Sequence, residues 1–241
     1  MNIREAAKSL AVNLGYDIRR TGPHFYERLY KRPIDFLRSR NIDLVIDVGA
    51  NVGQYGESLR KNAYAGWIVS FEPIAAAYEE LSTLANKDAR WKAFNMALGD
   101  NEGVAKINIS QAPVFSSILP QLPAATAFDS EAQVVRSESV RIARLDDVFA
   151  ELPRSKAAFL KIDTQGYEQQ VLLGAPVCLS SFLGVQMELP IIHLYEGTWK
   201  FHEAVAYMSD LGFEISNIMP TNYDQTDTVS LVEVDCIFRR R

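Results

Sequence analysis

Four acidic residues in this sequence lie within or directly after short apolar runs: Asp47, Glu72, Asp163 and Glu188. Runs of this kind are typical of strands buried in a parallel sheet. Because the carboxyl ends of parallel strands meet at one edge of the sheet, we expect Asp163 to lie close to Gly49 and Glu72. Carboxylates at such an edge can accept hydrogen bonds from ribose hydroxyls or take a proton from an alcohol. The sequence therefore predicts a ligand site at this edge.

A glycine-containing turn follows the first of these runs. The run Leu44–Val48 ends at Gly49, Gly53 follows four residues later, and the residues from Gln54 onward are predicted to form a helix. Glycine has no Cβ, so the backbone can turn tightly here and approach a ligand. A strand, a glycine turn and a helix form the first unit of a nucleotide-type site.

The residues around this turn favour one ligand over another. A dinucleotide site has the pattern G-x-G-x-x-G, but Asn51 replaces its middle glycine. Asp47 would repel a pyrophosphate and would pair well with a cationic amino-acid group. Glu72 lies about twenty residues further on, where an acid binds ribose hydroxyls. These features favour S-adenosylmethionine (SAM), which carries an ammonium and a sulfonium group and no phosphate.

Four motifs resemble those of the FkbM-type SAM-dependent methyltransferases, and the resemblance extends from about Ile42 to the C-terminus. The motifs are VIDVGANVGQYG, VSFEP, NMALGD and FLKIDTQGYEQQVLLGA. The resemblance implies a Rossmann-like class I methyltransferase fold, SAM as cofactor, and O-methylation of a hydroxyl on a carbohydrate, glycolipid or polyketide. It also implies that the NMALGD segment borders the adenine and that Ser116 and Ser117 lie near the active site.

The predicted cofactor-binding residues come from the glycine turn, the acid after the second strand, the NMALGD segment and the KID motif. They are Asp47, Gly49, Ala50, Asn51, Gly53, Glu72, Pro73, Met96, Ala97 and Asp163.

Methyl transfer to an alcohol requires a group that removes the hydroxyl proton. The predicted catalytic residues are Asp163, Glu188 and His193, although His193 could equally be a packed side chain between two apolar neighbours. The predicted substrate-binding residues are Ser116, Ser117, Glu168 and Tyr195. Glu168 could instead complement a helix dipole, and Ser116 and Ser117 could lie in a solvent loop. Carboxylates at Asp163, Glu188 and Asp235 could gather a divalent cation, but no spacing demands one, so we predict no metal.

Apolar runs alternate with helical patterns along the chain, which indicates an α/β fold with a mostly parallel, seven-stranded sheet and helices on both faces. We expect a helical extension over residues 1–40 and a SAM-binding domain over residues 41–241. The segment Gln111–Arg136 contains three prolines and is predicted to be an irregular loop. The expected strands are Leu44–Val48, Trp67–Phe71, Trp91–Asn95, Val104–Ile109, Val140–Leu145, Phe159–Asp163, Gly184–Pro190, Phe213–Ile218 and Ser230–Phe238.

The composition and charge of the chain limit the classes of binding partner that we expect. With 25 Lys and Arg against 30 Asp and Glu, the chain has a formal net charge of −5, which argues against a nucleic-acid groove. Cys178 and Cys236 form neither a metal motif nor a disulfide framework. No apolar run is long enough to span a bilayer, and no secretory signal is evident, so we expect a cytoplasmic protein. The partner is a small-molecule or glycan acceptor with a free hydroxyl, and the sequence leaves monomer and homodimer open.

The sequence thus predicts a SAM-dependent O-methyltransferase. Two alternatives remain at this stage: a non-catalytic SAM-binding protein, and a nicotinamide-dependent oxidoreductase on a similar sheet.

Overall fold

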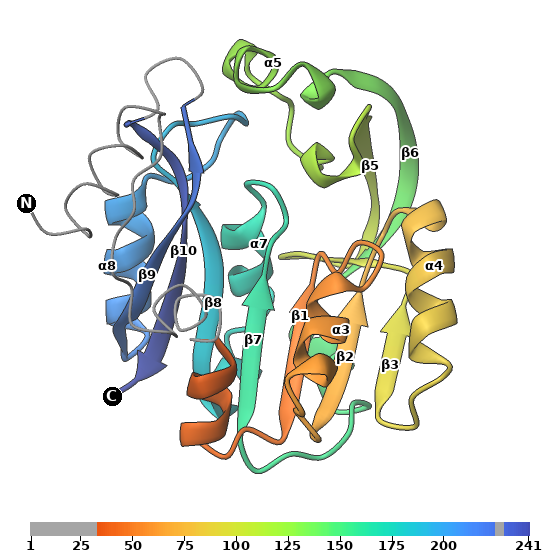
Figure 1. The fold of residues 1–241 in the computed structure, drawn as a ribbon, viewed down its shortest axis with the longest axis vertical. Helices are drawn as coiled ribbons and strands as arrows, with labels where there is room; N and C mark the ends of the chain where they lie inside the picture. Colours follow the sequence, from red (N-terminus) through yellow and green to blue (C-terminus); the bar gives the residue numbers. More distant parts are fainter. Residues whose placement is uncertain (1–32, 225–228) are drawn as a thin grey trace, which may run out of the picture.

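A seven-stranded sheet forms the centre of the protein (Figure 1). The computed structural model describes residues 33–224 and 229–241. The expectation of a helical extension over residues 1–40 therefore lies outside the described residues as far as residue 32, and residues 33–39 are helical. The strand order is β3-β2-β1-β7-β8-β10-β9. The strands are β1 (Leu44–Val48), β2 (Trp67–Phe71), β3 (Trp91–Phe94), β7 (Ala158–Ile162), β8 (Phe182–Pro190), β9 (Phe213–Tyr223) and β10 (Leu231–Arg240).

Strands β3, β2, β1, β7 and β8 are parallel, whereas β10 runs antiparallel to both of its neighbours. The carboxyl ends of the parallel strands therefore meet at one edge of the sheet. Because β10 is antiparallel, its amino-terminal end lies at this same edge. The fold class predicted from the sequence, a mostly parallel seven-stranded sheet with helices on both faces, is confirmed.

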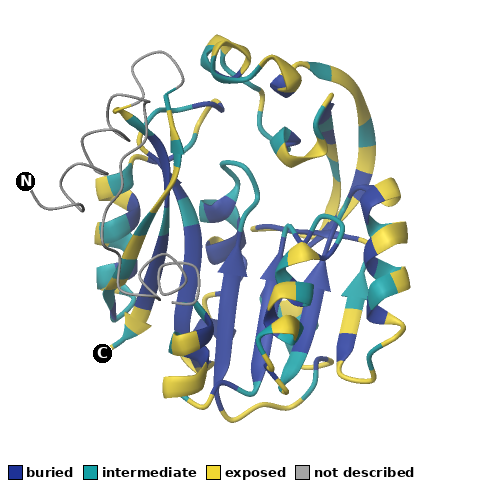
Figure 2. Cartoon of the chain, in the orientation of Figure 1, coloured by how far each residue is buried: buried dark blue, intermediate teal, exposed yellow. Residues whose placement is uncertain are grey.

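Helices cover both faces of the sheet because the strand side chains alternate between two cores. Leu44 and Ile46 of β1 pack on one face against α6 (Leu145–Phe149), α7 (Glu168–Leu173) and α8 (Phe201–Asp210). Val45 packs on the other face against the helix at residues 33–39, α3 (Gln54–Lys61) and α4 (Ala75–Ala85). Figure 2 shows the resulting pattern, with buried strands inside and helices that are exposed on their outer sides.

A second, three-stranded sheet lies above β2 and β3 (Figure 1), with the order β4-β6-β5. Its strands are β4 (Ala97–Leu98), β5 (Gly103–Ser110) and β6 (Val134–Ala143). The sequence predicted an irregular loop as far as Arg136 and a strand only from Val140. This prediction is wrong, because β6 begins at Val134 and pairs with β5 along its length. Between these strands lie the short helices η1 (Pro113–Phe115), α5 (Pro123–Phe128) and η2 (Ser130–Ala132).

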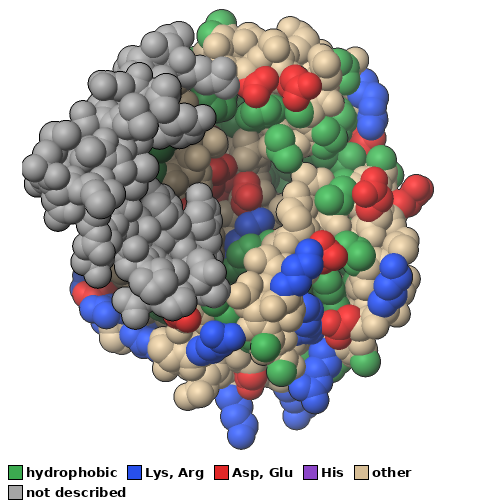
Figure 3. Space-filling model, in the orientation of Figure 1, with side chains coloured by type: hydrophobic (Ala, Val, Ile, Leu, Met, Phe, Trp, Pro, Cys, Tyr) green, Lys and Arg blue, Asp and Glu red, His purple; other side chains and the backbone are tan. Residues whose placement is uncertain are grey.

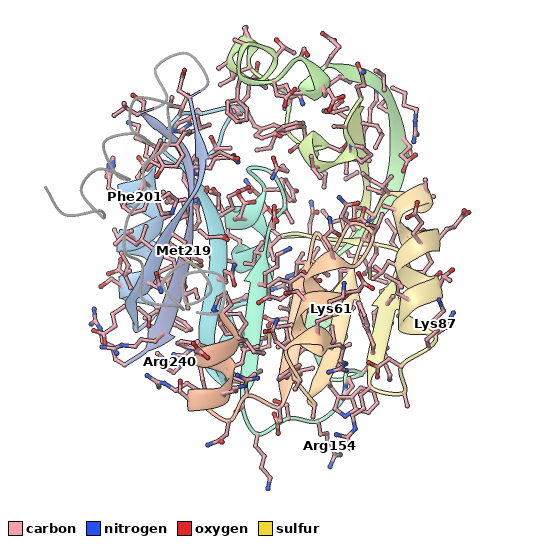
Figure 4. The ribbon with its side chains drawn as sticks, viewed as in Figure 1. Lys61, Lys87, Arg154, Phe201, Met219 and Arg240 are labelled. Atoms are coloured by element: carbon pink, nitrogen blue, oxygen red, sulfur yellow. The ribbon has the colours of Figure 1, made fainter. Side chains whose placement is uncertain are left out.

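Arginine side chains at the end of β10 bind neighbouring strands. Arg240, at the lower left of Figure 4, lies over the ring of Phe213 at 4.2 Å and donates a hydrogen bond to the carbonyl of Phe182. Arg239 pairs with Glu214 at 2.7 Å. Arg154 lies below the amino ends of the strands, far from the carboxyl edge (Figure 4). The basic residues at the C-terminus thus serve the packing of β10 against β8 and β9.

Candidate functional site

The turn after β1 has a backbone that only glycine fits. Gly49 has a φ of +76°, and a Cβ there would lie 1.9 Å from the carbonyl oxygen of Asp163. The amides of Gly49 and Ala50 both donate to the carbonyl of Phe71, at 3.0 and 3.1 Å. The turn is therefore held between the ends of β2 and β7, and its backbone faces the carboxyl edge of the sheet.

Glu72 binds the same turn from the end of β2. Its Oε2 accepts a hydrogen bond from the amide of Asn51, and its Oε1 accepts one from the amide of Ile74, both at 2.8 Å. Asn51 has a φ of +48°, a left-handed conformation that Asn tolerates better than most residues. Burial raises the pKa of Glu72 to about 7. The amide of Asn51 therefore already donates to Glu72 and is not free to bind a pyrophosphate, as the corresponding amide of a dinucleotide site would.

A cavity of about 510 Å³ opens at this edge, within the range of roughly 300–1,000 Å³ that is typical of small-molecule sites. Figure 3 shows the hollow, with acidic side chains and a basic one inside it. One end of the cavity, here called the glycine-turn end, is lined by predicted cofactor residues: Gly49, Ala50, Asn51, Glu72, Pro73, Met96 and Ala97.

The other end, here called the acidic end, is lined by the carboxylates of Asp163, Glu188, Glu233 and Asp235. Asp235 on β10 lies directly opposite Glu188 on β8 in the strand register, an arrangement of like charges that destabilises a sheet. Burial raises the pKa of Glu188 well above its usual range, and the surrounding carboxylates raise it further. Burial, followed by the charge of Asp163, raises the pKa of Asp235 to about 6. Costly clusters of this kind mark functional sites more often than structural ones.

Asp47 does not reach the cavity, which corrects the expectation that it meets the amino-acid part of the cofactor. Its side chain is fully buried in the sheet, and its Oδ1 lies 3.1 Å from Nζ of Lys161. The physical reason is the register: Asp47 lies opposite Lys161 on β7 and Ser70 on β2, within the strand and before the turn. Burial lowers the pKa of Lys161, but the neighbouring carboxylates outweigh it and the net shift is upward. Burial raises the pKa of Asp47, and the charge of Lys161 offsets part of that rise.

Three predicted substrate residues hold a turn instead of lining the cavity. Glu168 is buried, and its Oε1 accepts hydrogen bonds from the amides of Thr164 and Gly166. Oγ of Ser117 donates to the carbonyl of Gln165 at 2.7 Å. The hydroxyl of Tyr195 lies 2.8 Å from Oε1 of Gln165. Each of these three side chains, which were predicted to bind the substrate, thus forms hydrogen bonds with the turn over residues 164–166.

Three other predicted residues have different positions. Ser116 lines the cavity, and its Oγ accepts a hydrogen bond from the amide of Ser110. His193, which was predicted to be catalytic, does not line the cavity, and its Nδ1 lies 2.8 Å from Oγ1 of Thr198. Gly53 also lies outside the lining and caps α3, where a Cβ would come within 3.1 Å of Leu81. Its expected cofactor contact is corrected to a packing role.

Sequence reasoning missed several residues that line the cavity. Lys161 and Gln165 stand on either side of Asp163 within one predicted motif, yet neither was assigned a role. Glu233 was not assigned a role either, although it alternates with Asp235 along β10, a spacing that places both on one face of a strand. That signal was present, but its meaning depends on β10 lying beside β8.

The described residues contain no group of three or more His, Cys, Asp or Glu side chains arranged to hold a metal ion. No helix in the part of the chain that the structure describes has the length and apolar character to cross a membrane.

Residues 47–215 match the family model of the methyltransferase FkbM domain, which covers most of the chain and includes the glycine turn, Asp163 and Glu188. The chain belongs to the FkbM methyltransferase family. It is therefore a methyltransferase, and its cofactor is SAM. The nicotinamide alternative is thereby set aside. No protein of curated function matches the sequence.

Solved methyltransferase structures are similar to this FkbM-family protein. The methyltransferase domain of bacterial CtHen1-CN has 14% identity and a TM-score of 0.47, covering 88% of this chain and 98% of that one. Magnesium protoporphyrin IX methyltransferase from Synechocystis PCC 6803, with bound SAM, has 10% identity and a TM-score of 0.48, covering 100% and 98%. Fibrillarin from Aeropyrum pernix, with bound SAM, has 10% identity and a TM-score of 0.45, covering 81% and 66%.

The residues at the glycine-turn end fit the cofactor. Gly49 can lie this close to the backbone of Asp163 only because it has no Cβ, and this approach keeps the turn at the carboxyl edge of the sheet. Each carboxylate oxygen of Glu72 has spare acceptor capacity beside its one backbone hydrogen bond, which suits ribose hydroxyls. Lys161 is the one basic side chain among the described residues that line the cavity, and it already faces Asp47 and Asp163. This donor set suits a cationic cofactor without phosphate.

Proposed function

We propose that the protein is an O-methyltransferase that acts on a hydroxyl of a carbohydrate, glycolipid or polyketide-type natural product. The observation that carries the proposal is the acidic end of the cavity. Four carboxylates gather there beside the glycine-turn end, and carboxylates are the side chains that accept hydrogen bonds from several hydroxyls at once.

The cofactor supplies the methyl group on a positively charged sulfur, which makes the methyl carbon electrophilic. The protein must place an acceptor oxygen in line with that carbon and receive the proton that the hydroxyl releases. Asp163 ends β7 between the two ends of the cavity, and 40% of its side chain is exposed. We assign the proton acceptor to Asp163.

Glu188 contributes differently, since its raised pKa favours the protonated form. A protonated carboxyl both donates and accepts a hydrogen bond, so Glu188 can orient a hydroxyl from either side. Ser116 lines the opposite wall and adds a further hydroxyl. A polyol is the acceptor that uses all of these groups.

The same charges disfavour a nucleic acid as acceptor. The described side chains that line the cavity include five carboxylates, Glu72 among them, and one ammonium group. A phosphodiester would meet repulsion at the acidic end, whereas a neutral polyol would not. The two buried free thiols, Cys178 and Cys236, suit a reducing compartment, and we place the protein in the cytoplasm.

The test is an acceptor screen with SAM that carries a ¹³C-labelled methyl group. The panel contains deoxysugars, glycolipids and polyketides, with amine-bearing analogues of matched shape. We expect labelled methyl ethers, which differ in chemical shift from methylamines, and a strongly reduced yield of product from Asp163→Asn. Turnover of amines alone would contradict the proposal. Binding of S-adenosylhomocysteine (SAH) without turnover of any acceptor would favour the alternative of a non-catalytic SAM-binding protein.

A further inference from the structure

The residue that connects the two central carboxylates is Gln165. Its Nε2 lies 2.9 Å from Oε2 of Glu188 and 3.2 Å from Oδ1 of Asp163. An ionised carboxylate only accepts hydrogen bonds, and the amide nitrogen of Gln has two hydrogens to donate. One side chain thus bridges the end of β7 and the end of β8.

The orientation of this amide is fixed from the other side. The hydroxyl of Tyr195 lies 2.8 Å from Oε1 of Gln165 and 3.0 Å from the carbonyl of Phe115, and its hydrogen can serve either acceptor. With Oε1 facing Tyr195, Nε2 faces the carboxylates, and every polar atom of the amide has a partner. The opposite orientation would place the amide oxygen against two carboxylates.

The backbone of Gln165 is held just as closely. Its φ of +54° lies in the left-handed region, which is uncommon for a residue with a long side chain. Ser117 fixes its carbonyl, and Glu168 fixes the amides on both sides of it. The next residue, Gly166, leaves no space for a Cβ, which would lie 2.5 Å from Cγ2 of Thr198. Strain of this kind persists only where the surroundings determine the conformation, and such places cluster at active sites.

We infer that Gln165 is a positioning residue that holds the carboxylates of Asp163 and Glu188 at a fixed separation for the acceptor hydroxyl. The inference rests on the proposed function, in which both carboxylates contact the acceptor. It also gives one purpose to Ser117, Glu168 and Tyr195, which all hold Gln165 and do not line the cavity.

The hydrogen bond from Gln165 should also affect the protonation of Glu188, whether or not an acceptor is bound. A hydrogen bond from Nε2 stabilises the charged form of Glu188. Four carboxyl groups from three elements packed around it oppose this charge, namely Asp163 after β7, Glu168 on α7, and Glu233 and Asp235 on β10. When Nε2 is removed or lies too far away, no hydrogen bond from Gln165 offsets the repulsion by these carboxyl groups. The pKa of Glu188 should then rise.

Two variants remove the bridge in different ways. Gln165→Asn keeps an amide but shortens the side chain by one methylene, and Asn tolerates the left-handed backbone better than Gln. Gln165→Leu removes the amide at similar size. Gln169→Leu is the matched control, because Gln169 lies on α7 outside the cavity lining.

The experiment follows the carboxyl ¹³C signal of Glu188 against pH in SAH-saturated protein, with the signal assigned by its absence in Glu188→Gln. We expect the titration midpoint to rise by about one pH unit in Gln165→Asn and Gln165→Leu. The control should titrate as the unchanged protein, and SAH affinity should stay within about threefold in all three. If Gln165→Leu does not fold, Gln165→Asn carries the test alone.

An unchanged midpoint in folded Gln165→Asn would overturn the inference. Failure of the proposed function is a separate result, because it would appear as absence of hydroxyl methylation in the acceptor screen while the titration still reports on the bridge. With an accepted hydroxyl in hand, the same variants should lower kcat and leave the KM for SAM within about threefold.

Discussion

The two ends of the cavity are built in opposite ways. The glycine-turn end comes from one stretch of chain, residues 49–97, and its contacts are backbone amides that meet carbonyls and the carboxylate of Glu72. The acidic end comes from the ends of three strands and from the segment after β5, and its contacts are side chains of like charge. The difference teaches that local geometry along one stretch of chain builds the glycine-turn end, whereas only the assembled sheet brings the charges of the acidic end together.

The largest expected effect separates the two ends by activity. Asp163→Asn keeps the size of the side chain and removes its ability to take a proton, so we expect kcat to fall by roughly 10²–10⁴-fold. Affinity for SAH should stay within about threefold, as measured by calorimetry. If binding is lost together with activity, Asp163 belongs to the cofactor end and the division is wrong.

The next effect concerns the glycine turn itself. Gly49→Ala places a Cβ 1.9 Å from a backbone oxygen at a φ of +76°, and we expect SAH affinity to fall by about 100-fold as the turn shifts. Gly197→Ala is a matched control, because Gly197 has a φ of +73° and no heavy atom within 4 Å of the added Cβ. Equal losses of affinity in the two variants would show that backbone strain alone matters and that the close approach does not.

Stability should depend on pH because of the buried carboxylates. Burial raises the pKa values of Glu72 and Glu168 to about 7. The folded protein therefore holds protons that the unfolded chain has already released between about pH 4.5 and 7. The contribution of these two groups to the free energy of unfolding is fully present below that window and is lost as the pH rises through it. We expect the Tm to be several degrees lower at pH 8 than at pH 5, measured by thermal denaturation, and a flat or rising Tm would contradict this sign.

A smaller effect tests the turn that holds Gln165. Ser117→Ala removes a hydrogen bond to the carbonyl of Gln165, and we expect a loss of about 1 kcal/mol in the free energy of unfolding. Chemical denaturation measures this loss, and SAH affinity should not change. A marked loss of SAH affinity would mean that the turn supports the cofactor end as well.

The position of the glycine turn in the fold follows from the sequence for a physical reason. A parallel strand, the tight turn after it and the next acid are set by neighbouring residues, so the positions of Gly49 and Glu72 follow from local pattern alone. The fold followed similarly from the alternation of apolar runs and helical segments. Asp47 lies only two residues before the turn at Gly49, but it is still part of β1. Its side chain therefore faces Lys161 in the sheet.

The acidic end could not be predicted in the same way. Glu233 and Asp235 lie some seventy residues after Asp163, and they join it only because β10 inserts antiparallel between β8 and β9. Ser117 and Tyr195 were recognised as important, but whether a polar side chain faces a ligand or a backbone carbonyl depends on contacts across the fold. His193 shows the same limit, since Thr198 takes up its ring nitrogen.

The most direct test of the division between the two ends is a pair of calorimetric titrations with SAH. Glu72→Ala removes a buried carboxyl group at the glycine-turn end, and Glu188→Gln removes an ionisable group at the acidic end while keeping the size of the side chain. We predict that Glu72→Ala weakens SAH binding by about 1–3 kcal/mol, while Glu188→Gln binds SAH as the unchanged protein does. Unchanged affinity in Glu72→Ala, or a comparable loss in Glu188→Gln, would contradict the account.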